Sequence, residues 1–397
     1  MSNNNKTPAI RFKGFTDTWE QRKLSELTEI RSASRVHKEE WQSSGVPFYR
    51  SSDVMAALNG TENEKAFISE ELYEKLSAVS GKLEKGDVLV TGGGSVGKPY
   101  IVPNNEPLYT KDADLLWIKN NENLDPYFVY TFFFSPTFTD YLNSVSHVGT
   151  IAHYTITQLG ETPITLPCVS EQQKIGDYFR NLDSLITLHQ RKCDKLIQFK
   201  AAMLKKMFPP NGADKPEIRF KGFTDAWEQR KVQDVADRFD NLRIPVAANL
   251  RVHGTTPYYG ANGIQDYVEG FTHDGEFVLV AEDGANDLKN YPVKCVNGRI
   301  WVNNHAHVLQ GKAGIADNSF LAFAISQSDI ESLLVGGGRA KLNAEALMSI
   351  EFRLPCLQEQ YRIGEYLTQL DNLITLHQRK CDKYKSIKAG LIRKLFP

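Results

Sequence analysis

The sequence is poor in the features that mark disulfide-bonded, membrane-spanning and uniformly basic proteins. Five cysteines in 397 residues, an odd number, do not make a disulfide framework, so we expect reduced thiols. No run of eighteen apolar residues occurs, and the start has neither a basic region followed by an apolar run nor a small-residue cleavage site. We therefore expect a cytoplasmic protein that does not enter a membrane.

Charge of one sign is not in excess either. The 47 basic and 48 acidic residues give a net charge of -1, which excludes a uniformly basic surface for nucleic acid. Positive charge is nevertheless concentrated, because residues 166–209 and 354–397 each carry eight basic and four acidic side chains. These segments offer either solvated helix faces or surfaces for an acidic partner or a DNA backbone.

A long internal repeat dominates the chain. Residues 8–23, PAIRFKGFTDTWEQRK, return at 216–231 with 14 of 16 positions identical, and 166–209 return at 354–397 with 26 of 44 identical. The offset falls from 208 to 188 residues between these two matches, so two near-identical frames enclose unlike interiors. The frames predict one shared scaffolding role, while each interior performs its own version of a second role.

This order predicts an α+β protein with four segments. We expect a globular domain at 1–165, a helix at 166–209, a second globular domain at 210–353 and a second helix at 354–397. The prolines and glycine of PPNGADK separate the two copies. Short strands with Gly and Asn loops, together with a few helices, are expected in both interiors.

The two repeated helices are expected to pair with each other. Apolar residues spaced alternately by three and four predict a helix over 170–207 and an equal one in the second copy. A helix of this length with a heptad seam needs a partner, and the duplication predicts an antiparallel coiled coil with a pseudo-twofold axis. His189 and His377 lie on the seam as register-setting residues, and Gly176 and Gly364 indicate a close helix approach.

Some motifs suggest catalysis or metal binding, but the residues around them do not support that interpretation. DVLVTGGGSVGK at 87–98 contains GxGxxG, but Pro99 and Pro103 follow where a phosphate site needs a helix, so we predict strand, glycine loop and strand. Asp125-Pro-Tyr-Phe resembles an amino-methyltransferase motif without its second proline and is interpreted as a helix start. His305 and His307 lie on an alternating strand without a third metal ligand, which favours hydrogen bonding.

The two interiors have similar sequence features in the same order, although their sequences differ. Glycine-rich and asparagine-rich turns lie at matching places, beside Tyr, Ser, His, Arg and Lys residues of the kind that meet base edges and phosphates. The matched stretches are 45–52 with 256–263, 85–90 with 274–280, 111–114 with 304–307, and 149–153 with 338–341.

The whole chain resembles the specificity subunit of type I restriction-modification systems. The resemblance is carried by the duplicated RFKGFTD-WEQRK segments, the paired LP-C-EQ-IG-Y-LD-LITLHQRKCDK helices, GDVLVTGGGSVGK, and PYYGANGIQDY with WVNNHAHVL. It implies two target-recognition domains that each read half of a split double-stranded DNA site, with the helices setting the gap.

The same resemblance implies the partners and cofactors. Two methylation subunits would dock on the helices and bring S-adenosylmethionine, and restriction subunits would bring ATP hydrolysis with magnesium. The chain itself would hold no catalytic residue, cofactor or metal.

Loop type and repeat position nominate the DNA-contacting residues. In the first interior they are Tyr49, Arg50, Ser52, Ser95, Lys98, Lys111, Thr150 and His153. In the second interior they are Tyr258, Tyr259, Asn262, Asn303, Asn304, His305, Arg339 and Lys341. Two alternatives stay open: a duplicated protein-binding scaffold without DNA sequence specificity, and an enzyme that uses the glycine loop.

Overall fold

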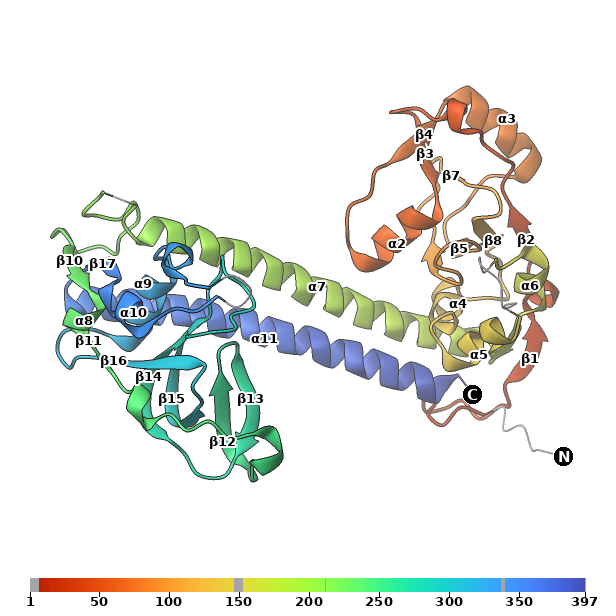
Figure 1. Cartoon of the computed structure of the whole chain (residues 1–397). Helices are drawn as coiled ribbons and strands as arrows, with labels where there is room; N and C mark the ends of the chain where they lie inside the picture. Colours follow the sequence, from red (N-terminus) through yellow and green to blue (C-terminus); the bar gives the residue numbers. More distant parts are fainter. Residues whose placement is uncertain (1–6, 146–152, 211, 337–339, 397) are drawn as a thin grey trace. The chain divides into compact units, whose positions relative to one another are not determined.

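The chain folds into two compact units. Its computed structural model is shown in Figure 1 and describes residues 7–145, 153–210, 212–336 and 340–396. The first unit comprises residues 1–189 and 379–397, and the second comprises residues 190–378. Both unit boundaries fall inside the long helices, so each unit holds part of both.

The first unit combines small sheets with short helices. Four strands form a sheet in the order β2-β8-β5-β6, three form β4-β3-β7, and β1 pairs with β9. The strands are β1 (Glu20–Lys23), β2 (Ile30–Ser32), β3 (Val46–Tyr49), β4 (Ala66–Ile68), β5 (Val88–Thr91), β6 (Pro99–Ile101), β7 (Tyr109–Thr110), β8 (Leu115–Ile118) and β9 (Pro163–Leu166). The short helices are α1 (Leu24–Leu27), α2 (Ser51–Asn59), α3 (Glu70–Ser80), α4 (Pro126–Phe132), α5 (Pro136–Val145) and α6 (Ile156–Glu161).

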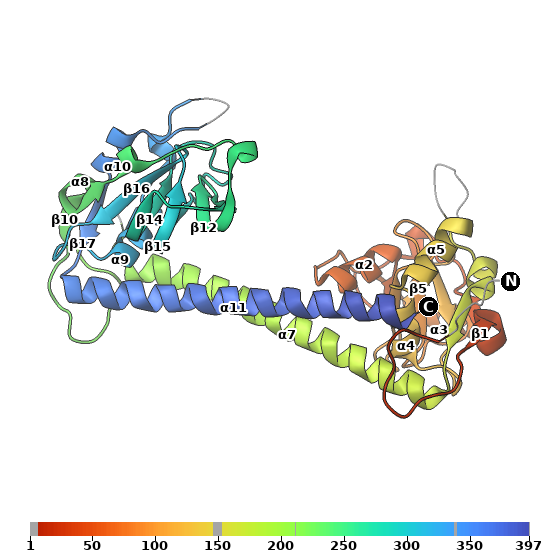
Figure 2. The ribbon, with the colours of Figure 1, turned by 90° about the horizontal axis from the view of Figure 1, so that it is seen from below.

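The second unit is built around one larger sheet. Its strand order is β11-β16-β14-β15-β12-β13, and Figure 2 shows β14, β15 and β16 side by side. The strands are β10 (Glu228–Lys231), β11 (Ala236–Arg238), β12 (His253–Gly260), β13 (Gly263–Val268), β14 (His273–Ala281), β15 (Val293–Val302), β16 (Ala306–Gly311) and β17 (Glu351–Leu354). The short helices are α8 (Val232–Val235), α9 (Asn318–Ser326) and α10 (Ala344–Ser349), with a 3-10 turn η2 (Asp240–Leu242).

Two local predictions are confirmed in the first unit. Residues 88–101 form strand, glycine loop and strand, because β5 pairs antiparallel with β6 and no helix follows the glycines. Asp125 caps α4: its Oδ1 accepts a hydrogen bond from the Phe128 amide at 2.8 Å, and Pro126 occupies the first helical position.

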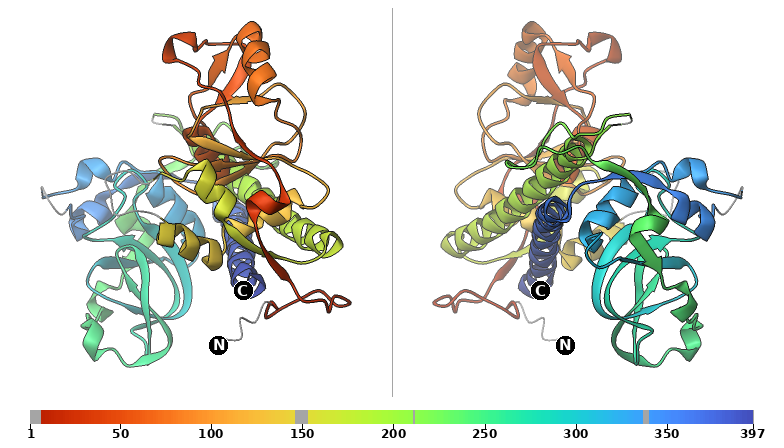
Figure 3. Two further views of the ribbon diagram at one scale, coloured as in Figure 1. Left: turned by 90° about the vertical axis from the view of Figure 1, so that its right-hand side faces the viewer. Right: turned by 90° about the vertical axis from the view of Figure 1, so that its left-hand side faces the viewer.

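The long helices are α7 (Val169–Met207) and α11 (Leu357–Leu395), each of 39 residues. Within the first unit Lys388 of α11 bonds Asp183 of α7 at 2.6 Å, and further along α7 the carbonyl of Ile186 accepts from the Cys381 thiol at 3.9 Å. In the second unit Lys200 bonds Asp371 at 2.6 Å, at the repeat-equivalent positions. Within the first unit rising numbers on α7 meet falling numbers on α11, which confirms the antiparallel pairing. Figure 3 shows α7 in green and α11 in blue.

The predicted seam position is confirmed for His189, which is buried, whereas His377 is half-buried. The His189 ring stacks on Tyr384 with 5.7 Å between centroids and 20° between planes. Both residues belong to the first unit. An imidazole and a phenol ring therefore hold this layer of the helix pair.

The end of each long helix completes a hydrophobic core. In the first unit Phe396 lies 5.3 Å from Phe128 and 6.4 Å from Trp19, centroid to centroid. In the second unit the repeat-equivalent Phe208 lies 6.0 Å from Trp227. Since α7 starts in the first unit and α11 starts in the second, each core is closed by the end of the helix that begins in the other unit.

The repeated Glu-Gln and Gly positions attach each interior to its helix. Buried Glu171 accepts two bonds from Arg11 at 2.8 and 2.7 Å, and Gln172 accepts from the Asp125 amide at 3.1 Å. A Cβ at Gly176 would overlap Oδ1 of Asp125. The second copy repeats every one of these contacts, through Arg219 with Glu359, Asp317 with Gln360, and Gly364. A close approach does occur at both glycines, but the approaching group is the cap aspartate of a short interior helix and not the paired long helix.

None of the helices in the described residues combines the length and apolarity that crossing a membrane requires.

Gly176→Ala should destabilise the first unit, because the new methyl group displaces the cap of α4. We expect a loss of about 1–3 kcal/mol in unfolding free energy, measured by thermal unfolding of the full chain. Gly390→Ala is the matched control, since Gly390 is also helical but has open space around its Cβ position. The control should gain up to about 1 kcal/mol. Equal effects of the two substitutions would contradict this account of Gly176.

Candidate nucleic-acid interface

Three loop segments meet at equivalent places in the two units. In the first unit the Gly92 amide donates to the Asp114 carbonyl at 2.8 Å, and the Tyr154 amide donates to the Gly92 carbonyl at 2.8 Å. In the second unit Glu282 donates to His305 at 2.9 Å, and Leu342 donates to Glu282 at 2.7 Å, again between backbone groups. The same backbone pattern therefore assembles the loops after β5 and β14, before β8 and β16, and before α6 and α10.

A fourth segment joins them at the end of a parallel strand pair. Lys111 donates its amide to the Tyr49 carbonyl at 2.8 Å, and Asn303 donates to the Tyr259 carbonyl at 3.1 Å. β3 runs parallel to β7 and β12 runs parallel to β15 at these points. The matching of the two interiors is thus a matching of topology, even though their sequences are unlike.

Most of the predicted contact residues lie on or near this loop surface. The exposed ones are Ser52, Ser95, His153, Asn262, Asn304 and Lys341. Tyr49, Arg50, Lys98, Lys111 and His305 are half-buried. Thr150 and Arg339 lie outside the described residues.

Three residues that were predicted to contact DNA are buried in the second unit. Tyr258 is 1% exposed and its hydroxyl bonds the backbone of Val246, and Tyr259 is 7% exposed within a core cluster. Asn303 is buried as well, and its Oδ1 accepts from the His305 amide at 2.8 Å. In this conformation these side chains offer little surface to a base or a phosphate, and they pack beneath the loops.

Two further predicted residues are engaged with the protein. Arg50 bonds Asp53 with 3.0 Å between Nε and Oδ2, and its guanidinium lies 5.5 Å from the Trp41 ring. Exposed Asn262 donates to the Gly284 carbonyl at 2.9 Å and accepts from the Asn286 amide at 2.9 Å. Both side chains therefore shape loops, whatever else they contact.

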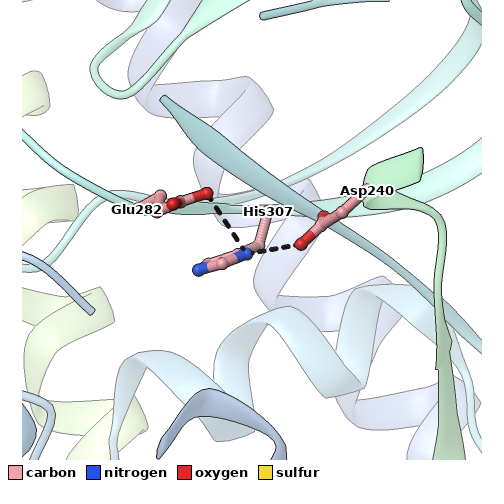
Figure 4. A group of neighbouring side chains, drawn as sticks. All are labelled: Asp240, Glu282 and His307. Atoms are coloured by element: carbon pink, nitrogen blue, oxygen red, sulfur yellow. Dashed lines mark hydrogen bonds and ion pairs between the residues drawn. The ribbon is translucent and has the colours of Figure 1, made fainter. Parts of the chain in front are cut away.

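An ion network lies beneath the loops of the second unit (Figure 4). His307 is buried, with Nδ1 2.7 Å from Oδ2 of Asp240 and Nε2 2.9 Å from the Leu342 carbonyl. Arg243 bonds Glu282 at 2.6 Å and the Ala306 carbonyl at 2.9 Å. Both ring nitrogens of His307 therefore face acceptor oxygens, so the ring is held from two sides.

The network resembles a three-ligand metal site in composition but not in its bonding. Ligand atoms of Asp240, Glu282 and His307 lie within 4.8 Å of one another. Arg243 contacts both carboxylates and Lys341 bonds Glu282 at 2.9 Å, so cationic side chains already supply the positive charge. The hydrogen-bonding interpretation of His307 is supported. Sequence reasoning missed the carboxylates because they are remote in the chain.

The hydrogen bonds and charges of the network lower the pKa of its two carboxyl groups. Burial raises the pKa of Asp240, but hydrogen bonds from His307 and the Val308 amide outweigh it and leave the pKa below its usual value. Burial also raises the pKa of Glu282, but hydrogen bonds from Arg243 and Lys341 outweigh burial, so the pKa lies below its usual value. Both groups are thus held ionised beneath the loop surface.

Comparison with known proteins points to one family. A family model described as type I restriction modification DNA specificity domain matches twice, at residues 16–198 and 224–385. A putative type I restriction enzyme specificity subunit of Haemophilus influenzae is 44% identical over 146 residues, which is 37% of this chain and 38% of that protein. A putative specificity subunit of Methanocaldococcus jannaschii is 20% identical and is covered to 93%, with 96% of this chain.

A solved structure shares the fold. The S subunit of a type I restriction-modification system from M. genitalium superposes with a TM-score of 0.71 over 98% of this chain and 99% of that one, at 15% identity. The α+β architecture with two domains and long helices is therefore confirmed.

The ion network should make the second unit acid-sensitive. A carboxyl group with a lowered folded pKa stabilises the protein above its unfolded pKa, about 4, and this stabilisation is lost as the pH falls through the folded value. Arg243→Met should raise the pKa of both carboxyl groups and move the midpoint of acid unfolding to higher pH, followed by circular dichroism. Arg299→Met, which removes the exposed pair with Asp274, is the control and should leave the midpoint in place. An unchanged midpoint in Arg243→Met would count against the network.

Proposed function

This chain belongs to the type I restriction modification DNA specificity family, and we propose that it is the sequence-recognition subunit of a type I restriction-modification complex. Each unit reads one half of a bipartite double-stranded DNA site with its loop surface. The observation that carries the proposal is the pair of equivalent loop surfaces, built from unlike sequences inside one repeated frame. Two loop surfaces with different sequences on one scaffold can recognise the two different halves of a bipartite site.

The long helices set the distance between the two readers in this proposal. α7 and α11 each pass without a break from one unit into the other. A continuous helix resists bending and changes length by about 1.5 Å per residue. Only one separation of half-sites then allows both readers to bind at once, so their specificities combine.

We also propose that two methylation subunits dock on the helices. The repeated sequence LITLHQRKCDK leaves Leu185 and Leu188 exposed in the first unit, and their equivalents Leu373 and Leu376 are exposed in the second. Exposed apolar side chains kept in both copies suit two copies of one partner.

The remaining chemistry belongs to the partners in this proposal. The methylation subunits bring S-adenosylmethionine, the restriction subunits bring ATP and magnesium, and the assembly works in the cytoplasm. This chain contributes no cofactor site and no catalytic residue. Its contribution is selective binding, with each good bidentate base contact worth about 1–3 kcal/mol.

Exchanging residues 232–353 for the interior of another family member should change one half of the methylated site and leave the other half intact. Each interior carries its own loop surface, while the frame that positions it is kept. The methylated sequences in cells that carry the complex provide the measurement. A change in both halves would contradict two independent readers, and no preference in random DNA would favour the protein-binding scaffold.

Four residues inserted after Gln190 in α7 and after Gln378 in α11 should widen the accepted gap. Four residues lengthen a helix by about 6 Å, which corresponds to about two base pairs. Methylation of sites with different gaps measures the effect. The same insertion in α7 alone is the control, because it shifts the paired seam and should lower stability without defining a new gap. An unchanged gap after the double insertion would disprove the spacer role.

A further inference from the structure

Each unit gathers one carboxylate, one histidine and one lysine around the same point of its loop surface. We name these groups the reading clusters: Lys111, Asp114 and His153 in the first unit, and Asp283, His305 and Lys341 in the second. Lys111 bonds Asp114 at 2.5 Å, and a Cβ at Gly93 would lie 3.1 Å from Oδ1 of Asp114 and 3.8 Å from Nδ1 of His153. Asp283 bonds Nδ1 of His305, and its backbone pairs with that of Lys341 in a β-bridge, while the Lys341 ammonium bonds the adjacent Glu282 at 2.9 Å.

The three residue types are the same in the two clusters, but they stand on different segments. The backbone bonds described above place Asp114 at the position of His305 and His153 at the position of Lys341. Gly93 then stands where Asp283 stands in the second unit. The units therefore present the same acceptor and donor types in a different spatial order, as two readers of different half-sites require.

Both carboxylates reach the surface. The side chain of Asp114 is 29% exposed and that of Asp283 is 23% exposed. A carboxylate has about four lone-pair positions, so a carboxylate that already has partners in the protein can accept a further hydrogen bond. By contrast, Asp240 and Glu282 are held by His307 and Arg243 beneath the surface.

A carboxylate on a DNA-binding surface is repelled by phosphates and is stabilised by hydrogen-bond donors on the bases. In the major groove the hydrogen-bond donors are the exocyclic amino groups of adenine N6 and cytosine N4. Resting on the proposed function, we propose that Asp114 and Asp283 each accept a hydrogen bond from such an amino group, one in each half-site. The neighbouring lysine and histidine supply donors to adjacent acceptors of bases or phosphates and offset the repulsion.

The test uses the full chain in complex with its methylation subunits. The bound motif is first selected from random duplex DNA. Each adenine of the motif is then replaced by purine, and each cytosine by 2-pyrimidinone, which remove the amino group and retain the ring. Wild type should lose roughly tenfold to a hundredfold in affinity at one position of each half-site. The analogue that causes the loss distinguishes adenine from cytosine.

Substitutions connect each lost contact to its carboxylate. Asp114→Ala should abolish the sensitivity to amino-group removal in one half-site only, and Asp283→Ala should abolish it in the other. Asp114→Asn and Asp283→Asn keep an accepting oxygen and should retain part of the sensitivity. Glu74→Ala and Asp274→Ala remove exposed ion-paired carboxylates outside the clusters and should change nothing. Thermal unfolding confirms that each variant is folded.

The outcomes separate this inference from the proposed function. Sensitivity to amino-group removal that persists in both Ala variants would overturn the assignment while leaving a reader of bipartite DNA. If removal of an amino group at any position of the motif leaves the affinity of the wild type unchanged, the assignment of Asp114 and Asp283 is overturned, even if no variant folds. Failure of wild type to select a two-part motif would overturn the proposed function itself.

Discussion

The fold depends on aromatic contacts at the ends of the two long helices. Phe396 packs against Trp19 in the first unit, and Phe208 packs against Trp227 in the second. Each of these phenylalanines ends a helix that starts in the other unit, so neither interior has a complete core from its own half of the sequence. Burial of large aromatic side chains is among the strongest contributions to a core, which makes the two halves of the chain depend on each other to fold.

The repeated frame holds its interiors in a way that tolerates divergence. The contacts made by Gln172 and Gly176 are to the backbone and the cap of α4, and Arg11 bonds Glu171 within the frame itself. Backbone groups and a helix cap are available in almost any interior that places a short helix there. The loops on the far side of these contacts can change their side chains without loss of attachment, which is what a family of DNA readers needs.

Features with a local or periodic cause were predictable. The spacing of apolar residues predicted both long helices, the prolines after the glycine loop predicted a strand, and Asp125 predicted a helix cap. Side-chain roles on the loop surface were harder to predict. Tyrosine is common both in cores and at interfaces, and only the sheet shows that Tyr258 faces inward to Val246. The partners of His307 were unpredictable because Asp240 lies 67 residues away.

The sequence by itself determined the duplication, the antiparallel helix pair and the order of matching segments in the two interiors, because repeats and periodicity can be recognised without knowing contacts. The structure shifts one of these matches, since Asp114 corresponds to His305 and not to His307. The tertiary structure alone decided which polar residues share a surface. It brought Asp283 to His305, and in the other unit it brought His153 to the same glycine position as Asp114. Side chains on separate strands meet only when the sheet forms, and their proximity depends on strand register rather than on any distance along the chain.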